Sequence, residues 1–181
     1  YAVMELISET WQLLKEGYGC SEDEIASFFE GMAKNRLSSY LAEITAKVLR
    51  YPDEDGSPLI EKILPVAGQK GTGKWTSLEG VERGIYIPMI YQSAAIRAFS
   101  GHRTAFGAYG KGAFLPLADD VDSDAVADAL YLGILCSYAQ GLSLIRKASD
   151  EFGWKIDMAA SVALWEGGCI IRSEMLKDIV A

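Results

Sequence analysis

The residues best suited to chemistry lie in one glycine-rich segment, which reads AGQKGTGKWT at positions 67–76. Closely spaced glycines expose backbone N–H groups, and Lys70 and Lys74 bring positive charge beside them. Thr76 and Glu79 have the spacing of a capping box, so a helix beginning there would direct further N–H groups at the same place. The segment therefore predicts a site for a phosphate or a carboxylate. A tight turn with solvated lysines is the alternative interpretation.

The same segment fits the first seven positions of the nucleotide-binding P-loop pattern. The eighth position of that pattern is a serine or threonine that binds magnesium, whereas here it is Trp75. Residues 60–67 predict a short helix and a turn, and not the strand that precedes a P-loop. ATP or GTP binding is therefore not predicted.

No metal site is predicted elsewhere. The acidic segment 53–58 resembles a calcium loop, but counting Gly56 as the sixth position places Tyr51 where an aspartate is required, so a solvated turn is the better interpretation. His102 is the single histidine, and it lies in a turn-like stretch. The cysteines Cys20, Cys136 and Cys169 have no paired spacing, which favours small, reduced side chains in a cytoplasmic protein.

Composition favours one domain over residues 1–181. About half of the residues are apolar, and the formal net charge is −8. This charge argues against partners that need a basic face, such as nucleic acids and anionic membranes. The sequence also contains no uncharged apolar run of membrane-spanning length.

An apolar helical stripe starts at the first residue, Tyr1. We therefore expect the sequence to be part of a longer protein.

Hydrophobic periodicity predicts an all-α, multi-helix fold without strands. The expected helices cover about residues 1–16, 22–33, 38–50, 59–64, a segment starting at 76, 88–99, 103–109, 125–152, 157–165 and 170–180. The long central helix, 125–152, is apolar nearly all round, so we expect it to be buried in this chain or in a partner. This pattern favours a dimer, although a large monomeric core would produce the same signal.

Several segments together resemble 6-phosphogluconate dehydrogenases. They are residues 67–76, SYAQGLSLI at 137–145, ALWEGGCIIRSEML at 163–176 and, more weakly, EITAKVL at 43–49. Enzymes of this family are cytoplasmic oxidoreductases of the pentose phosphate pathway and of gluconate utilisation. They oxidise and decarboxylate 6-phosphogluconate with NADP, which gives ribulose 5-phosphate. The resemblance implies that this chain is the helical C-terminal domain, with the substrate and a second copy of the chain as partners.

The resemblance also implies a substrate site. Tyr1, Lys70, Thr72 and Arg97 match family positions that contact 6-phosphogluconate, chiefly around its phosphate. Lysine and arginine form charge-assisted bonds with a phosphate, and Thr72 adds a hydroxyl group. Without the resemblance, Arg97 would be interpreted as a snorkelling or ion-paired helix residue, Tyr1 as a core or interface aromatic, and Thr72 as a turn residue.

Other parts of the family's machinery are not expected in this chain. The family's catalytic lysine and glutamate precede the position matched by Tyr1, and the cofactor fingerprint belongs to an N-terminal Rossmann domain. No catalytic or NADP-binding residue is therefore assigned here, and this chain alone is expected to be inactive. Pro65, Gln92 and Glu166 depart from the usual family residues. Two alternatives stay open: a helical dimerisation or binding module without activity, and a divergent dehydrogenase of another hydroxy acid.

Overall fold

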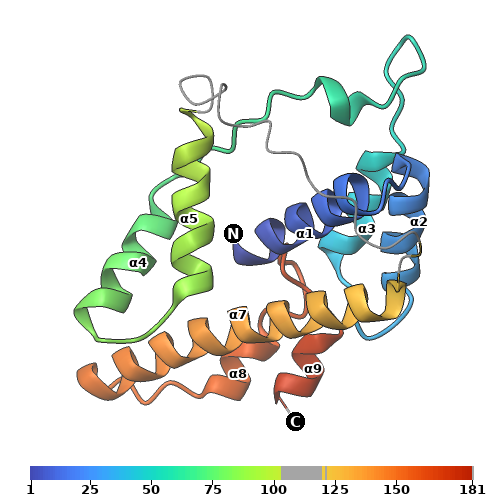
Figure 1. The fold of residues 1–181 in the computed structure, drawn as a ribbon. Coiled ribbons are helices and arrows are strands. Elements are labelled where there is room, and N and C mark those ends of the chain that lie inside the picture. Colours follow the sequence, from blue (N-terminus) through green and yellow to red (C-terminus); the bar gives the residue numbers. More distant parts are fainter. Residues whose placement is uncertain (103–119, 121, 181) are drawn as a thin grey trace. The chain divides into compact units, whose positions relative to one another are not determined.

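A computed structural model describes residues 1–102, 120 and 122–180 of the chain (Figure 1). The regular structure of these residues is helical and contains no strand, which confirms the predicted all-α fold. The chain divides into two compact units, each built from segments far apart in sequence. Unit 1 comprises Tyr1–Ser8, Leu64–Leu115 and Leu132–Ile156, and unit 2 comprises Glu9–Ile63, Pro116–Tyr131 and Asp157–Ala181.

The helices follow one another as α1 (Ala2–Gln12), η1 (Leu13–Gly17), α2 (Glu22–Met32), α3 (Tyr40–Leu49), η2 (Leu59–Lys62), α4 (Thr72–Glu82), α5 (Pro88–Ser100), α7 (Ser123–Phe152), α8 (Met158–Ala163) and α9 (Met175–Val180). Here η1 is a π-helical turn and η2 is a 3₁₀-helix. The predicted helix at 103–109 lies outside the described residues.

In unit 2, helices α2 and α3 pack against each other around apolar side chains such as Ile25, Phe29 and Leu49, which are almost fully buried. A capping box fixes the start of α2 at Glu22, the residue where this helix is predicted to begin. The Ser21 side chain accepts a bond from the Glu24 N–H, and the Glu24 carboxylate accepts one from the Ser21 N–H at 2.8 Å. This reciprocal pair satisfies two backbone donors that the helix itself leaves free.

In unit 1, α4 and α5 lie side by side and antiparallel (Figure 1). The turn between them is tight because Gly80 lies against Ile87. A Cβ atom at Gly80 would come within 2.5 Å of the Ile87 side chain. Pro88 then occupies the first turn of α5, where its missing N–H has no cost.

Helix α4 begins four residues earlier than predicted. The capping box expected at Thr76 is wrong, because the Thr76 hydroxyl donates to the Thr72 carbonyl at 2.9 Å inside the helix. The N-cap is Gly71, whose left-handed backbone (φ 96°) reverses the chain just before Thr72. A glycine adopts this conformation without steric cost. Helix α4 can therefore begin at Thr72 without a side-chain cap. The last helix, α9, begins at Met175 and is shorter than expected.

The long helix α7 confirms the predicted length and is buried along one stripe. Its buried side chains recur mostly at three- and four-residue spacing, and they include Val126, Leu130, Ile134, Tyr138 and Leu144. Other apolar residues of α7 are open to solvent in the single chain, and Leu132 is 60% exposed. By length and composition alone α7 could cross a membrane, a test that core helices of soluble proteins also pass.

Candidate anion-binding site

The side chain of Arg97 occupies the centre of the candidate site. Its guanidinium carbon lies 3.9 Å from the centroid of the Tyr1 ring, a cation–π arrangement. One terminal nitrogen, Nη1, donates to the Gly68 carbonyl at 3.0 Å. The other, Nη2, lies 3.7 Å from the sulfur of Met4. Arg97 therefore joins the start of the chain to the glycine-rich segment, within unit 1.

Arg97 has no carboxylate partner among the described residues. Arg36, Arg50, Arg83 and Arg172, in contrast, all form ion pairs. A thioether is a weak acceptor, so the Nη2 edge of Arg97 holds donors that a stronger acceptor could take. The arginine is thus positioned by its contacts while keeping the charge that an anion would bind.

The first turn of α4 offers further donors beside Arg97. No side chain caps this helix, and its first internal bond runs from the Trp75 N–H to the Gly71 carbonyl at 3.0 Å. The N–H groups of Thr72, Gly73 and Lys74 consequently have no acceptor within the helix. Such free N–H groups, together with the helix dipole, attract negative charge. The Thr72 hydroxyl lies at this same turn.

Close packing of Tyr1 holds the first turn of α4 in place. A Cβ atom added at Gly73 would lie 2.7 Å from Cε2 of Tyr1 and 3.1 Å from the Ala94 side chain. Only glycine therefore allows the Tyr1 ring to approach this turn so closely. On the opposite side of the turn, the Trp75 ring lies against Gly71 and is 64% exposed.

Two lysines bring positive charge to this turn. In the described part of the chain, neither Lys70 nor Lys74 takes part in an ion pair, in contrast to Lys15, Lys62, Lys147 and Lys177. Lys70 is two residues from Gly68, so their Cα atoms are within about 7 Å. Together with Arg97, these lysines would favour a bound anion.

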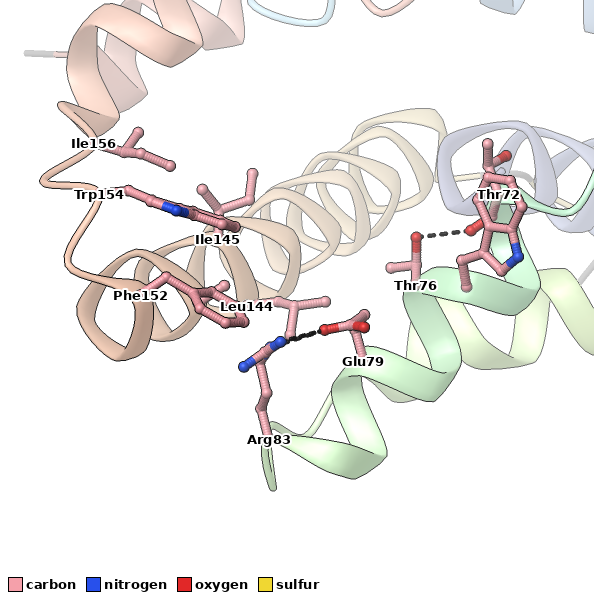
Figure 2. A pocket seen from close by; sticks show the side chains of 11 residues that line it. Thr72, Thr76, Glu79, Arg83, Leu144, Ile145, Phe152, Trp154 and Ile156 are labelled. Carbon is pink, nitrogen blue, oxygen red and sulfur yellow. Dashed lines mark hydrogen bonds and ion pairs between the residues drawn. The ribbon is translucent and has the colours of Figure 1, made fainter.

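A cavity of about 650 Å³ lies on another face of α4, between this helix and the end of α7 (Figure 2). Its walls are mainly apolar, with Leu144, Phe152 and Trp154 on the α7 side. Its arginine, Arg83, is already bound to Glu79 and Glu151 and lies over the Phe152 ring. Since this charge is neutralised, the cavity does not suit a phosphate.

The predicted site residues fall into one region of unit 1. Tyr1 and Arg97 touch directly, and Thr72 is the first residue of α4, next to the Gly73 that packs on Tyr1. Lys70 follows the Gly68 that Arg97 binds. Thr72 alone of this set also borders the apolar cavity. Sequence reasoning missed the glycine contact at Gly73 and the Met4 sulfur, because both depend on the packing of segments about 70 or more residues apart.

The helical fold and the uncapped, lysine-bearing turn beside Arg97 define a helical domain with a candidate anion-binding region. The family model for the C-terminal domain of 6-phosphogluconate dehydrogenase matches residues 1–181. The chain belongs to the 6-phosphogluconate dehydrogenase family.

Solved and curated relatives agree with this assignment. The decarboxylating 6-phosphogluconate dehydrogenase of Schizosaccharomyces pombe is 44% identical over 99% of this chain and 37% of its own length. The human enzyme is 39% identical over 99% of this chain and 38% of its own. The Plasmodium falciparum enzyme, solved in its apo form and with NADP+ and 6-phosphogluconate, is 34% identical, with a TM-score of 0.88. The match covers 40% of the Plasmodium falciparum chain. The present chain thus spans about two fifths of the length of these relatives.

Proposed function

We propose that this chain supplies the phosphate-binding part of the substrate site in a decarboxylating 6-phosphogluconate dehydrogenase. The observation that carries the proposal is that Arg97, which forms no ion pair among the described residues, is held beside the uncapped first turn of α4. An arginine fork, free N–H groups and two lysines are the donors that a phosphate dianion requires. Membership of the family gives this anion its chemical identity.

Each residue has a distinct role in the proposed site. Arg97 presents its Nη2 edge to the phosphate and exchanges the Met4 sulfur for a phosphate oxygen. Lys70 adds charge from the exposed loop, and Thr72 adds its hydroxyl group and the first free N–H of α4. The Tyr1 ring supports the guanidinium from one face. We assign its hydroxyl group to a contact with the substrate.

The complete reaction needs parts outside these residues. We assign NADP to a preceding Rossmann domain, because the described residues contain no strand that leads into a glycine-rich turn, the arrangement that binds dinucleotides. Residues just upstream of the position matched by Tyr1 would supply the acid and base, and NADP would accept the hydride. The whole protein would then be a cytoplasmic oxidoreductase that converts 6-phosphogluconate to ribulose 5-phosphate, in the pentose phosphate pathway and in gluconate utilisation.

We also propose that two copies of the chain associate through α7. Apolar side chains of this helix, among them Leu132 and Leu135, stay exposed in the single chain. A second copy would remove them from water, and symmetric homodimers are the commonest oligomers. If the chain binds no phosphate, its role is dimerisation alone. A helical dimerisation module is therefore the second candidate function.

Calorimetric titration of the chain with 6-phosphogluconate and with unphosphorylated gluconate tests the proposal. The buffer must contain neither phosphate nor sulfate. We expect weak, phosphate-dependent binding that falls about 10- to 100-fold in Lys70→Ala and in Arg97→Ala, since each loses a charge-assisted bond. Arg146→Ala is the matched control, because it removes an exposed arginine of α7. Equal binding of both ligands, or none, would reject the phosphate site and favour the dimerisation module.

A further inference from the structure

The segment that leads into the glycine-rich turn is tied to α5 at only a few points. Residues 65–70 are exposed and have no regular secondary structure. Two bonds hold them to α5: the Ala67 N–H donates to the Ser100 hydroxyl oxygen at 2.9 Å, and Arg97 donates to the Gly68 carbonyl. Ser100 and Arg97 are three residues apart, so both side chains project from the same face of the helix.

The Ser100 hydroxyl group acts as a relay between the loop and the helix. It donates its proton to the Arg97 carbonyl at 2.7 Å and accepts the Ala67 N–H on its oxygen. The Ala67 carbonyl lies farther away, at 3.4 Å, so the Arg97 carbonyl is the better acceptor. Consecutive bonds of this kind polarise and strengthen one another. The relay fixes the backbone of Ala67 against the residue that bears the guanidinium.

The two tethers differ in their relation to the ligand. In the proposed site the Arg97 guanidinium binds the phosphate through its Nη2 edge and the Gly68 carbonyl through Nη1, so one charged group serves both the loop and the ligand. The Ser100 bond involves no charged group and does not compete with the ligand. It therefore keeps the loop at α5 while Arg97 changes partner.

We propose that Ser100 is a positioning residue that sets the place of Gly68 and Lys70 relative to Arg97 before the phosphate binds. This inference deepens the proposed function and rests on it. Ser100 contacts only the protein and acts on the ligand through the Ala67 backbone.

The test uses Ser100→Ala, Ser100→Thr and Ser143→Ala. Threonine keeps the hydroxyl group and serves as the rescue variant. Ser143 is the matched control, because its hydroxyl group donates to the Ala139 carbonyl at 2.7 Å, a bond within α7. Each variant is titrated with 6-phosphogluconate and gluconate, and hydrogen exchange is followed at the Ala67 amide.

We expect Ser100→Ala to bind 6-phosphogluconate about 3- to 10-fold more weakly, the effect of one hydrogen bond, with faster exchange at Ala67. Ser100→Thr and Ser143→Ala should bind within about 2-fold of the wild type, and gluconate binding should not change. If the wild type shows phosphate-dependent binding and Ser100→Ala matches it, the positioning role is wrong and the proposed function stands. If the wild type shows no phosphate-dependent binding, the proposed function itself fails, and the inference fails with it.

Discussion

Arg97 contacts its own chain through groups of very different strength, and this difference explains why it can change partner. The carbonyl of Gly68 and the ring of Tyr1 position the guanidinium, whereas the sulfur of Met4 binds it weakly. Arg83 has the opposite design, with carboxylates of Glu79 and Glu151 that neutralise it. The partners of an arginine, more than its location on a helix, thus distinguish a binding residue from a structural one.

Replacing Arg97 with lysine separates charge from geometry. The ammonium group keeps the positive charge but cannot bind the Gly68 carbonyl and a phosphate as a planar fork. We expect calorimetry to show about 10-fold weaker binding of 6-phosphogluconate in Arg97→Lys, a loss of about 1.4 kcal/mol. Arg146→Lys makes the same change at an exposed position of α7 and should bind like the wild type. Equal affinity in both variants would show that charge alone is required.

Asp55 gives unit 2 a defined response to acid. Bonds from Lys62 at 2.6 Å and from Ser57 lower the pKa of its carboxyl group from 3.8 to about 2. A lowered pKa means that the folded chain prefers the ionised form. This contribution to stability is therefore present above pH 3.8 and is lost as the pH falls toward 2.

The expected result for Asp55→Asn is a smaller loss of unfolding free energy between pH 4 and pH 2, measured by urea denaturation. Glu54→Gln is the control, because it removes a neighbouring carboxylate that forms no ion pair among the described residues. An Asp55→Asn protein that loses as much stability as the wild type over this range would contradict the role of Lys62.

At the scale of elements, two helices with side-chain caps begin within a residue of their predicted starts. The Ser21 and Glu24 side chains cap α2, and the Asp157 side chain accepts from the Ala160 N–H at the start of α8. Helix α4 was misplaced because its start depends on the left-handed Gly71, and glycine patterns do not reveal which glycine reverses the chain. The contact between Tyr1 and Gly73 also escaped prediction, because packing between distant segments leaves no periodic signal.

Helix α4 should be sensitive to a single methyl group at Gly73. Because a Cβ atom there would overlap the Tyr1 ring, we expect Gly73→Ala to lower the free energy of unfolding by about 1–3 kcal/mol. Gly68→Ala adds the same methyl group where no atom lies within 4 Å, and it should cause no loss. Chemical denaturation measures both. Comparable stability of the two variants would contradict the close packing of Tyr1 on this turn.

For the whole molecule, composition and family resemblance predicted the fold class and the family, both of which are confirmed. The division into two compact units was not foreseen, because each unit combines segments far apart in sequence. The burial of α7 was only partly predictable. An apolar helix signals that something covers it, but its periodicity does not say whether this is the same chain or a second copy.

Association through α7 can be tested with Leu132→Glu. A charge at this exposed apolar position should be tolerated by the single chain but not in an apolar interface, so we expect the dimer to dissociate at least about 10-fold more readily. Sedimentation equilibrium measures this change. Val81→Glu is the control, because Val81 is an 81% exposed residue of α4. A wild type that is monomeric at all concentrations would reject the proposed dimer.

The Trp75 ring, which lies against Gly71 and is mostly open to solvent, gives the chain an intrinsic optical probe. Indole fluorescence depends on polarity and on nearby charge, and this indole is attached to the turn that the anion would occupy. With Trp11, Trp154 and Trp165 replaced by phenylalanine, the emission of the remaining indole would follow ligand titrations without a label. In a stopped-flow instrument, the same variant would record the rate of anion binding.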